Sequence, residues 1–267
     1  MSSPAALCSS ETRDPAQFTP RLLAAEEIHL IPVRLCAAPE VEIIARSILP
    51  EEDLAQAADL LNPQRRSRFL LTQALLRTLI AGYLSRAGEP VTPAEIVLHR
   101  GPSGKPHLPV PVPLHFNLSH SGSLAIFAFS LDTEIGVDLE ELRPVPHAEE
   151  IADRFFAPEE SADLCRLTKN ADPKQVQHLF FSCWTRKEAY VKAIGTGLDF
   201  PLDRFRVSLN PCQPSALLRI DDDDRACWCL HSIASIPGFL AALACRCTRK
   251  TLHEWPLLES TRILLAQ

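Results

Sequence analysis

The sequence is poor in glycine, has no long apolar run and carries no excess of positive charge. Only 9 of its 267 residues are glycine whereas 23 are proline, so we expect stiff connections rather than flexible glycine-rich linkers. No stretch reaches the length of about 18 apolar residues that a membrane-spanning helix needs. The first residues also lack the basic and apolar regions of a secretory signal. We therefore expect a soluble, cytoplasmic protein that does not bind a membrane.

Acidic residues outnumber basic ones, with 33 Asp and Glu against 27 Lys and Arg, and the net charge is −6. This sign excludes a protein whose whole surface binds nucleic acid, so any polyanionic ligand must meet a local basic site. The nine cysteines are an odd number in a chain much longer than a disulfide-stabilised scaffold, so we expect reduced thiols.

Local patterns predict a helix followed by strands, and this order occurs twice. Asn62 can cap and Pro63 can begin a long helix whose apolar residues recur at helical spacing until Gly88. Alternating residues predict three strands between His115 and Glu140. The second set is predicted as helices near 148–156, 158–168 and 173–194, then β-like residues 204–247 with a turn at Pro237–Gly238.

These patterns divide the chain into four segments. Residues 1–27 are predicted as a flexible leader rich in Ser, Pro and Ala, and residues 249–267 as a C-terminal tail. Between them, residues 28–133 form an N-terminal half. Residues 134–248 form a C-terminal half that carries the candidate metal ligands.

Asp138 and Glu140 lie two residues apart in a stretch of strand character, so both carboxylates are predicted on one face. Ile135, Val137 and Leu139 alternate with them, and burial of that apolar face would direct the carboxylates the same way. Two interpretations remain open. The pair is either an exposed polar strand face or two ligands for a common cation.

Glu188 and Lys192 lie four residues apart on the predicted helix 173–194 and are therefore neighbours on one helix face. They could form an ordinary surface ion pair, which contributes about 0.3–0.5 kcal/mol. Alternatively, Glu188 is a third oxygen ligand or a base, and Lys192 faces a phosphate. A magnesium ion suits this second interpretation, because it binds a few carboxylates and completes its shell with water and phosphate oxygens.

Basic and polar residues that suit an anionic ligand are spread over three segments. They are Arg65, Arg66, Arg68, Lys105, Ser119 and His120. Each has an ordinary alternative, which is solvent exposure for the charged residues and a structural hydrogen bond for the histidine. Together they would offer guanidinium, ammonium, hydroxyl and imidazole groups to phosphate oxygens.

Four cysteines flank the predicted turn at Pro237–Gly238. If this turn joins two strands symmetrically, Cys227 pairs with Cys247 and Cys229 pairs with Cys245. The sulfur atoms could then bind zinc, form cross-strand disulfides or pack as small apolar groups. The C-x-C spacing differs from the C-x-x-C spacing usual for structural zinc, so packing is favoured.

Three segments occur together in an order typical of one family. They are GKPHLP with HFNLSHSG, then IGVDLEELRP, and then FSCWTRKEAYVKAIGTGL followed by DRFRVSL. In these motifs the sequence resembles the Sfp-type 4′-phosphopantetheinyl transferases over about residues 60–245. The resemblance implies an α+β fold of two pseudo-twofold-related α/β halves, each a small antiparallel sheet packed with a long helix. Since one chain contains both halves, we expect a monomer.

Members of this family transfer the 4′-phosphopantetheine arm of coenzyme A to a serine of an apo acyl or peptidyl carrier protein and release adenosine 3′,5′-bisphosphate. The resemblance implies that Asp138, Glu140 and Glu188 bind magnesium. It implies that coenzyme A is bound by Arg68, Lys105, Ser119, His120 and Lys192. The catalytic residues would be Glu188, Lys192 and His120, with Glu188 as the candidate base, directly or through a water molecule.

Two other functions remain open at this point. The same acidic residues could serve a magnesium-dependent nucleotide pyrophosphohydrolase, which would consume coenzyme A without a carrier protein. A non-catalytic module could also bind coenzyme A or a carrier protein on the same fold. Neither the carrier nor its pathway, whether fatty-acid, polyketide or non-ribosomal peptide synthesis, follows from these residues. Because carriers and this chain are both acidic, docking is expected to use a local apolar or basic surface.

Overall fold

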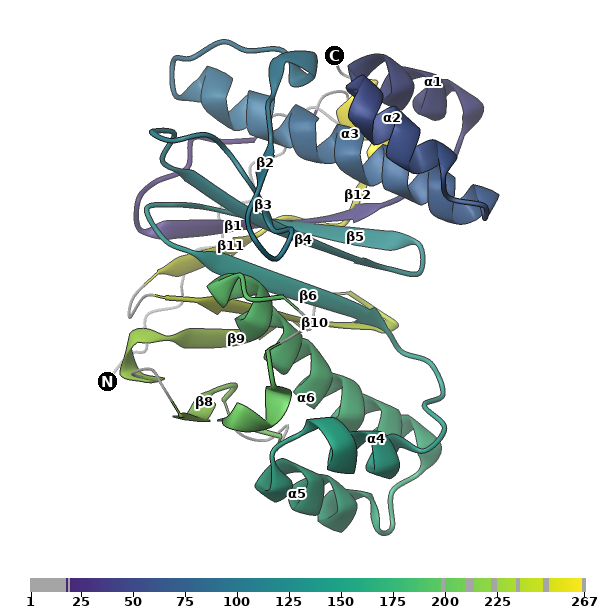
Figure 1. Cartoon of the computed structure of the whole chain (residues 1–267), viewed down its shortest axis with the longest axis vertical. Helices are drawn as coiled ribbons and strands as arrows, with labels where there is room; N and C mark the ends of the chain where they lie inside the picture. The colour runs from purple at the N-terminus through teal and green to yellow at the C-terminus, as the bar shows by residue number, and fades with distance from the viewer. Residues whose placement is uncertain are drawn as a thin grey trace, which may run out of the picture.

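The structure is a computed structural model, and it describes residues 18, 20–197, 200–209, 214–221, 225–233, 236–246 and 250–265. Two sheets lie between two layers of helices (Figure 1). In Figure 1 the N-terminal half, with the long helix α3 (Pro63–Arg86), lies above the C-terminal half, with the long helix α6 (Pro173–Ile194). None of the described helices is both long enough and apolar enough to cross a membrane.

The N-terminal sheet has the strand order β11-β1-β5-β4, and β12 pairs with the end of β1. Its strands are β1 (Glu27–Arg34), β4 (Leu114–Ser121), β5 (Leu124–Leu131), β11 (Thr251–Glu254) and β12 (Leu258–Glu259). The other elements of the N-terminal half are α1 (Pro39–Ile48), α2 (Glu51–Ala58), α7 (Ser260–Leu264), the 3-10 helix η1 (Pro93–Glu95) and a hairpin of β2 (His99–Arg100) and β3 (Pro106–His107).

The C-terminal sheet has the strand order β6-β10-β9, and its three strands are antiparallel. They are β6 (Ile135–Glu141), β9 (Cys229–Ile233) and β10 (Phe239–Cys245). The remaining elements are α4 (Ala148–Phe155), α5 (Pro158–Thr168), a small sheet of β7 (Phe205–Val207) and β8 (Leu217–Ile220), and the 3-10 helices η2 (Leu202–Arg204) and η3 (Arg225–Cys227).

The two halves repeat one arrangement of strands. In the N-terminal half β5 lies between β1 and β4, and in the C-terminal half β10 lies between β6 and β9. In each half the long helix follows the first of these three strands in the chain. This confirms the predicted α+β fold of two related halves. One detail of the prediction is wrong, because the N-terminal sheet is not wholly antiparallel: β11 and β12 join β1 in parallel.

Apolar side chains fill three layers of core. Successive residues of a strand point to opposite faces, so Ile126 of β5 and Val137 of β6 meet between the two sheets. Phe127 of β5 points the other way, into the core beneath α3 with Leu75. Tyr190 of α6 belongs to the third core, on the outer face of the C-terminal sheet. Both sheets are therefore covered on both faces.

The predicted long helices are confirmed, together with their start and stop signals. Helix α3 begins at Pro63, and the Asn62 side chain accepts a hydrogen bond from the backbone N–H of Arg65 at 3.0 Å. Helix α6 is capped by Asp172 and ends at Gly195, whose φ of 70° suits glycine. The predicted helices at 148–156 and 158–168 correspond to α4 and α5.

The C-terminal residues differ from the predicted tail. Strands β11 and β12 extend the N-terminal sheet, and α7 contributes Ile263 and Leu264 to the core beneath α3. The segment 251–264 is therefore part of the N-terminal half. The proposed leader lies mostly outside the described residues, but Phe18 packs against the Trp255 ring at a centroid distance of 5.0 Å.

The cysteine hairpin is confirmed for one pair. Cys229 of β9 and Cys245 of β10 are register partners, as the symmetric turn predicts. Cys247, the predicted partner of Cys227, lies outside the described residues. In the part of the chain that the structure describes, no group of three or more His, Cys, Asp or Glu side chains is arranged to hold a metal ion. Packing remains the favoured interpretation for this pair.

Candidate active site

Strand β6 places the two predicted acidic ligands on one face. Ile135, Val137 and Leu139 are buried in the core between the sheets. The side chains of Asp138 and Glu140 therefore point the other way, toward α6. This is the alternation that the sequence predicts, and burial of the apolar face is its cause.

Helix α6 crosses this face closely because residue 136 of β6 is glycine. A Cβ atom at Gly136 would overlap the backbone of Ala189 and Ala193. The close approach brings Glu188 and Lys192 of the helix onto the acidic face of the strand. The functional candidates of β6 and α6 thus meet because one side chain is absent.

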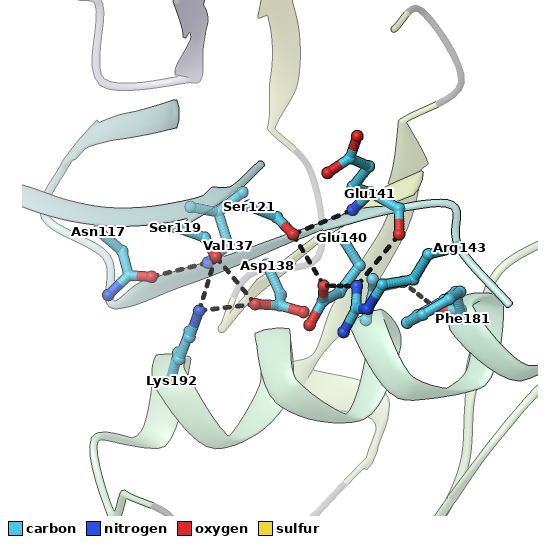
Figure 2. Close-up of polar contacts among 11 residues, drawn as sticks. Asn117, Ser119, Ser121, Val137, Asp138, Glu140, Glu141, Arg143, Phe181 and Lys192 are labelled. Atoms are coloured by element: carbon cyan, nitrogen blue, oxygen red, sulfur yellow. Dashed lines mark hydrogen bonds and ion pairs between the residues drawn. The ribbon is translucent and has the colours of Figure 1, made fainter. Parts of the chain in front are cut away.

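Asp138 is buried and is held through only one of its carboxylate oxygens (Figure 2). Its Oδ1 accepts hydrogen bonds from Lys192 Nζ at 2.7 Å and from Ser119 Oγ at 3.0 Å. Its Oδ2 is buried with no hydrogen-bond partner among the described residues. Burial raises the pKa of Asp138, and the Lys192 ammonium opposes this shift. A bound cation would give this oxygen the partner that it lacks.

Glu140 is held in the same way by a different pair of donors. Its Oε2 accepts hydrogen bonds from Ser121 Oγ and from Arg143 Nη1, both at 2.9 Å. The Arg143 guanidinium also lies over the Phe181 ring at 4.9 Å from the centroid. Figure 2 shows Asp138 and Glu140 side by side, each bonded to a serine of β4 and to a cationic side chain.

Glu188 completes the acidic group from α6. It is buried, and its pKa is raised first by burial and then by the negative charges of Asp138 and Glu140. Glu188 therefore lies within electrostatic range of Asp138 and Glu140. Among the described residues, no three acidic side chains are arranged closely enough to hold a metal ion, and Lys192 and Arg143 form ion pairs with Asp138 and Glu140.

Two of the predicted basic residues, Lys192 and His120, lie near the acidic group, and Arg68 lies within electrostatic range of His120. The pKa of His120 is lowered by burial and by the positive charges of Lys192 and Arg68, which therefore lie near its ring. Lys192 uses two of its three N–H donors, on Asp138 and Ser119, within the described part of the chain. This leaves one donor for an anionic ligand.

The other predicted basic residues have different surroundings. Arg65 is exposed, and Arg66 donates two hydrogen bonds to the carbonyl oxygen of Leu60, at 2.9 and 3.2 Å. No hydrogen bond or ion pair among the described residues links these two arginines to the acidic group.

Lys105 differs most from the role that the resemblance implies. Its Nζ donates to Glu134 Oε2 at 2.9 Å, to the Ile135 carbonyl at 3.1 Å and to the Ala193 carbonyl at 3.0 Å. All three N–H donors are therefore used, and none is left for a phosphate. In this structure Lys105 instead connects its loop by hydrogen bonds to β6 and to the end of α6.

Sequence reasoning missed three residues of the site. Asn117 accepts a hydrogen bond from the backbone N–H of Val137 at 2.9 Å, and Ser121 and Arg143 hold Glu140. The alternation of 117, 119 and 121 along β4 was a usable signal, because it matches the alternation of β6. What the sequence does not reveal is that the two strands face each other.

Similarity to known proteins agrees with this arrangement. The family model described as the 4′-phosphopantetheinyl transferase superfamily matches residues 134–245. The chain is 34% identical over 229 residues to 4′-phosphopantetheinyl transferase HetI of Nostoc sp., which covers 81% of this chain and 90% of that protein. The chain belongs to the 4′-phosphopantetheinyl transferase family.

Two further relatives come from other bacteria. 4′-Phosphopantetheinyl transferase Sfp of Bacillus subtilis is 31% identical over 202 residues, with 73% of this chain and 86% of that protein covered. 4′-Phosphopantetheinyl transferase AcpT of Salmonella typhimurium is 34% identical over 180 residues, with 67% and 80% covered. In this transferase the matched range 134–245 carries the acidic group, whereas Arg68 and His120 come from the N-terminal half.

Proposed function

We propose that the protein transfers the 4′-phosphopantetheine arm of coenzyme A to a serine of an apo acyl or peptidyl carrier protein and releases adenosine 3′,5′-bisphosphate. The observation that carries this proposal is the meeting of Asp138, Glu140 and Glu188 with Lys192 at the junction of the halves. Carboxylates that can bind a cation therefore lie beside the Lys192 ammonium group, which can bind a phosphate. Transfer from a pyrophosphate requires both.

The acidic residues fit a magnesium ion. Asp138 Oδ2 is buried without a partner among the described residues, and the carboxylates of Glu140 and Glu188 lie within electrostatic range of Asp138. We propose that Asp138, Glu140 and Glu188 hold the ion. When bound, magnesium would neutralise negative charge on the pyrophosphate of coenzyme A.

The basic residues are proposed to bind and orient coenzyme A. Lys192 and Arg68 both lie within electrostatic range of His120, which supports a common anionic ligand. The remaining N–H donor of Lys192 would stabilise charge on the phosphate under attack. Ser119 keeps the Lys192 ammonium in place through its 3.0 Å hydrogen bond.

Glu188 is the proposed base. In the reaction the serine oxygen of the carrier forms a new bond to the phosphorus next to pantetheine, and the bond to the adenosine-side phosphate breaks. The serine proton must leave at the same time. A bound cation would lower the pKa of Glu188, so we propose that the proton reaches this carboxylate through a water molecule.

We propose that the carrier protein docks beside the acidic group. An apolar groove of about 300 Å³ adjoins Glu140 and supports this position. Its lining includes Arg143, Val145, Ile151, Phe180, Phe181 and Trp184. An apolar groove with one arginine at its edge suits an acidic partner with a small apolar contact surface. Raised salt is expected to weaken this docking only in part.

We further propose that the enzyme acts as a monomer in the cytoplasm. One chain supplies both related halves and all the residues of the site, which supports a monomer. An odd number of cysteines, nine in all, is consistent with a reducing compartment.

The test is to mix the protein with coenzyme A, Mg²⁺ and a panel of apo-carrier domains and to identify modified carriers by mass spectrometry. We expect at least one carrier to gain the arm in step with release of adenosine 3′,5′-bisphosphate. Glu188→Gln should still bind coenzyme A but transfer nothing. Loss of coenzyme A without a carrier would instead identify a pyrophosphohydrolase, and binding without any product would identify a non-catalytic module.

A further inference from the structure

Side chains of β4, rather than a strand ladder, connect the two halves at the active site. β4 and β6 belong to different sheets. Asn117 nevertheless bonds to Val137 of β6, while Ser119 and Ser121 bond to Asp138 and Glu140 (Figure 2). The spacing of two on one strand matches the spacing of two on the other. Asp138 and Glu140 therefore each accept a hydrogen bond from a different serine.

The two serines hold their carboxylates in the same manner. Asp138 is bonded through Oδ1 to Ser119 and a lysine, and Glu140 is bonded through Oε2 to Ser121 and Arg143. The second oxygen of Asp138 is buried without a partner, and Glu140 Oε1 accepts no hydrogen bond from the described residues. One oxygen of each carboxylate is thus anchored, and the other remains for a ligand.

The hydroxyl proton of Ser121 has a defined direction. Its Oγ accepts a hydrogen bond from the backbone N–H of Glu141 at 3.1 Å. A hydroxyl has a single proton, so the N–H bond from one side directs that proton to Glu140 Oε2. Arg143 bonds the same oxygen from an exposed side chain that also contacts the Phe181 ring.

We propose that Ser121 is a positioning residue that fixes the Glu140 carboxylate for a divalent cation. This inference rests on the proposed function, since it assigns Glu140 to the cation. Without the hydroxyl, Glu140 would be held by Arg143 alone and would follow that side chain outward. The ion would then lose one preorganised oxygen ligand, while the fold and the other ligands stay in place.

The test measures binding of Mn²⁺, used in place of Mg²⁺, by electron paramagnetic resonance in the absence of coenzyme A and carrier. We expect Ser121→Ala to weaken Mn²⁺ binding by about tenfold or more, as is usual when a residue that supports a metal ligand is lost. Ser121→Thr keeps the hydroxyl and should restore binding. Thermal unfolding is measured for each variant in parallel.

Ser123→Ala is the matched control. It truncates a serine in the turn that follows β4, two residues after Ser121. The backbone carbonyl of Ser123 accepts a hydrogen bond from the backbone N–H of Leu35 at 2.9 Å, and this bond does not depend on the side chain. Mn²⁺ binding by this variant should equal that of the wild type. The inference is overturned if Ser121→Ala binds Mn²⁺ as the wild type does, if the control loses binding equally, or if binding falls only along with the unfolding temperature.

Failure of the proposed function would give a different result. In that case the wild type would bind Mn²⁺, and Ser121→Ala would bind it less tightly, but no carrier would gain the arm. If the function and the inference both hold, Ser121→Ala should need more Mg²⁺ for half-maximal transfer, with little change in the KM for coenzyme A.

Discussion

Gly136 of β6 lies directly against Ala193 of α6. A Cβ atom on residue 136 would come closer than 3.0 Å to the backbone N and Cα of Ala193 and to the carbonyl oxygen of Ala189. Backbone atoms cannot move aside as a flexible side chain can. The strand that carries Asp138 is therefore in contact with the helix that carries Lys192, and the distance between them is set by a missing methyl group.

Gly136→Ala is expected to damage both stability and activity. The added methyl group must push α6 away from β6, and overpacking of this kind typically costs about 1–3 kcal/mol. The 2.7 Å contact between Lys192 and Asp138 would lengthen as well. A shift of about 1 Å at a reacting group can lower the rate by roughly 100-fold. Urea unfolding and carrier-modification kinetics measure the two effects.

Gly101→Ala is the matched control for this variant. A Cβ atom there would lie 3.7 Å from the carbonyl oxygen of Lys105, which is ordinary van der Waals contact. We expect a change within about 0.5 kcal/mol and normal activity. Equal stability of Gly136→Ala and the wild type would show that α6 does not depend on this contact.

Glu160→Gln is expected to destabilise the C-terminal half strongly. Glu160 and Lys187 are both fully buried and form an ion pair with an N–O distance of 2.6 Å. Removal of the negative charge leaves the Lys187 ammonium buried without a counter-charge, which typically costs about 3–5 kcal/mol. Chemical denaturation measures the loss. The same substitution at Glu42, in an exposed pair with Arg46, should cost less than about 1 kcal/mol.

Much of the fold could be predicted because its signals are local. Asn62, Pro63 and Gly195 mark helix ends by rules that concern only their immediate neighbours. Helices α1 and α2 were not predicted because they lack a clear capping residue. Their N-cap residues are Ala38 and Pro50, and neither side chain caps the helix.

Contacts between distant segments could not be predicted in the same way. β11 pairs with β1 across more than 200 residues, and no local pattern in 251–254 specifies that partner. The candidate site shows the same limit. Motifs identify Asp138 and Glu188, but the roles of Ser121 and Lys105 depend on which segments meet at the junction of the halves.

Lys105→Met and Glu134→Gln are both expected to raise the Kd for coenzyme A. If Lys105 acts by holding its loop against β6 and α6, removal of its partner Glu134 should have the same direction of effect as its own removal. A lysine that binds phosphate directly would respond differently, since Glu134→Gln removes a negative charge and should leave coenzyme A binding equal or tighter. Calorimetric titration with coenzyme A separates these outcomes.

The stability of the N-terminal half is expected to fall in mild acid because of His29. This side chain is fully buried, its Nδ1 lies 2.8 Å from the Tyr83 hydroxyl, and Glu27 and Arg21 contact its Nε2. Burial lowers the pKa of His29 from 6.5 to about 4, so between these values the unfolded chain binds a proton that the folded chain does not. Stability must then rise with pH across this window, by up to about 3 kcal/mol. Urea unfolding of the wild type and of His29→Gln at pH 7, 6 and 5 isolates this contribution, and identical slopes for the two proteins would rule it out.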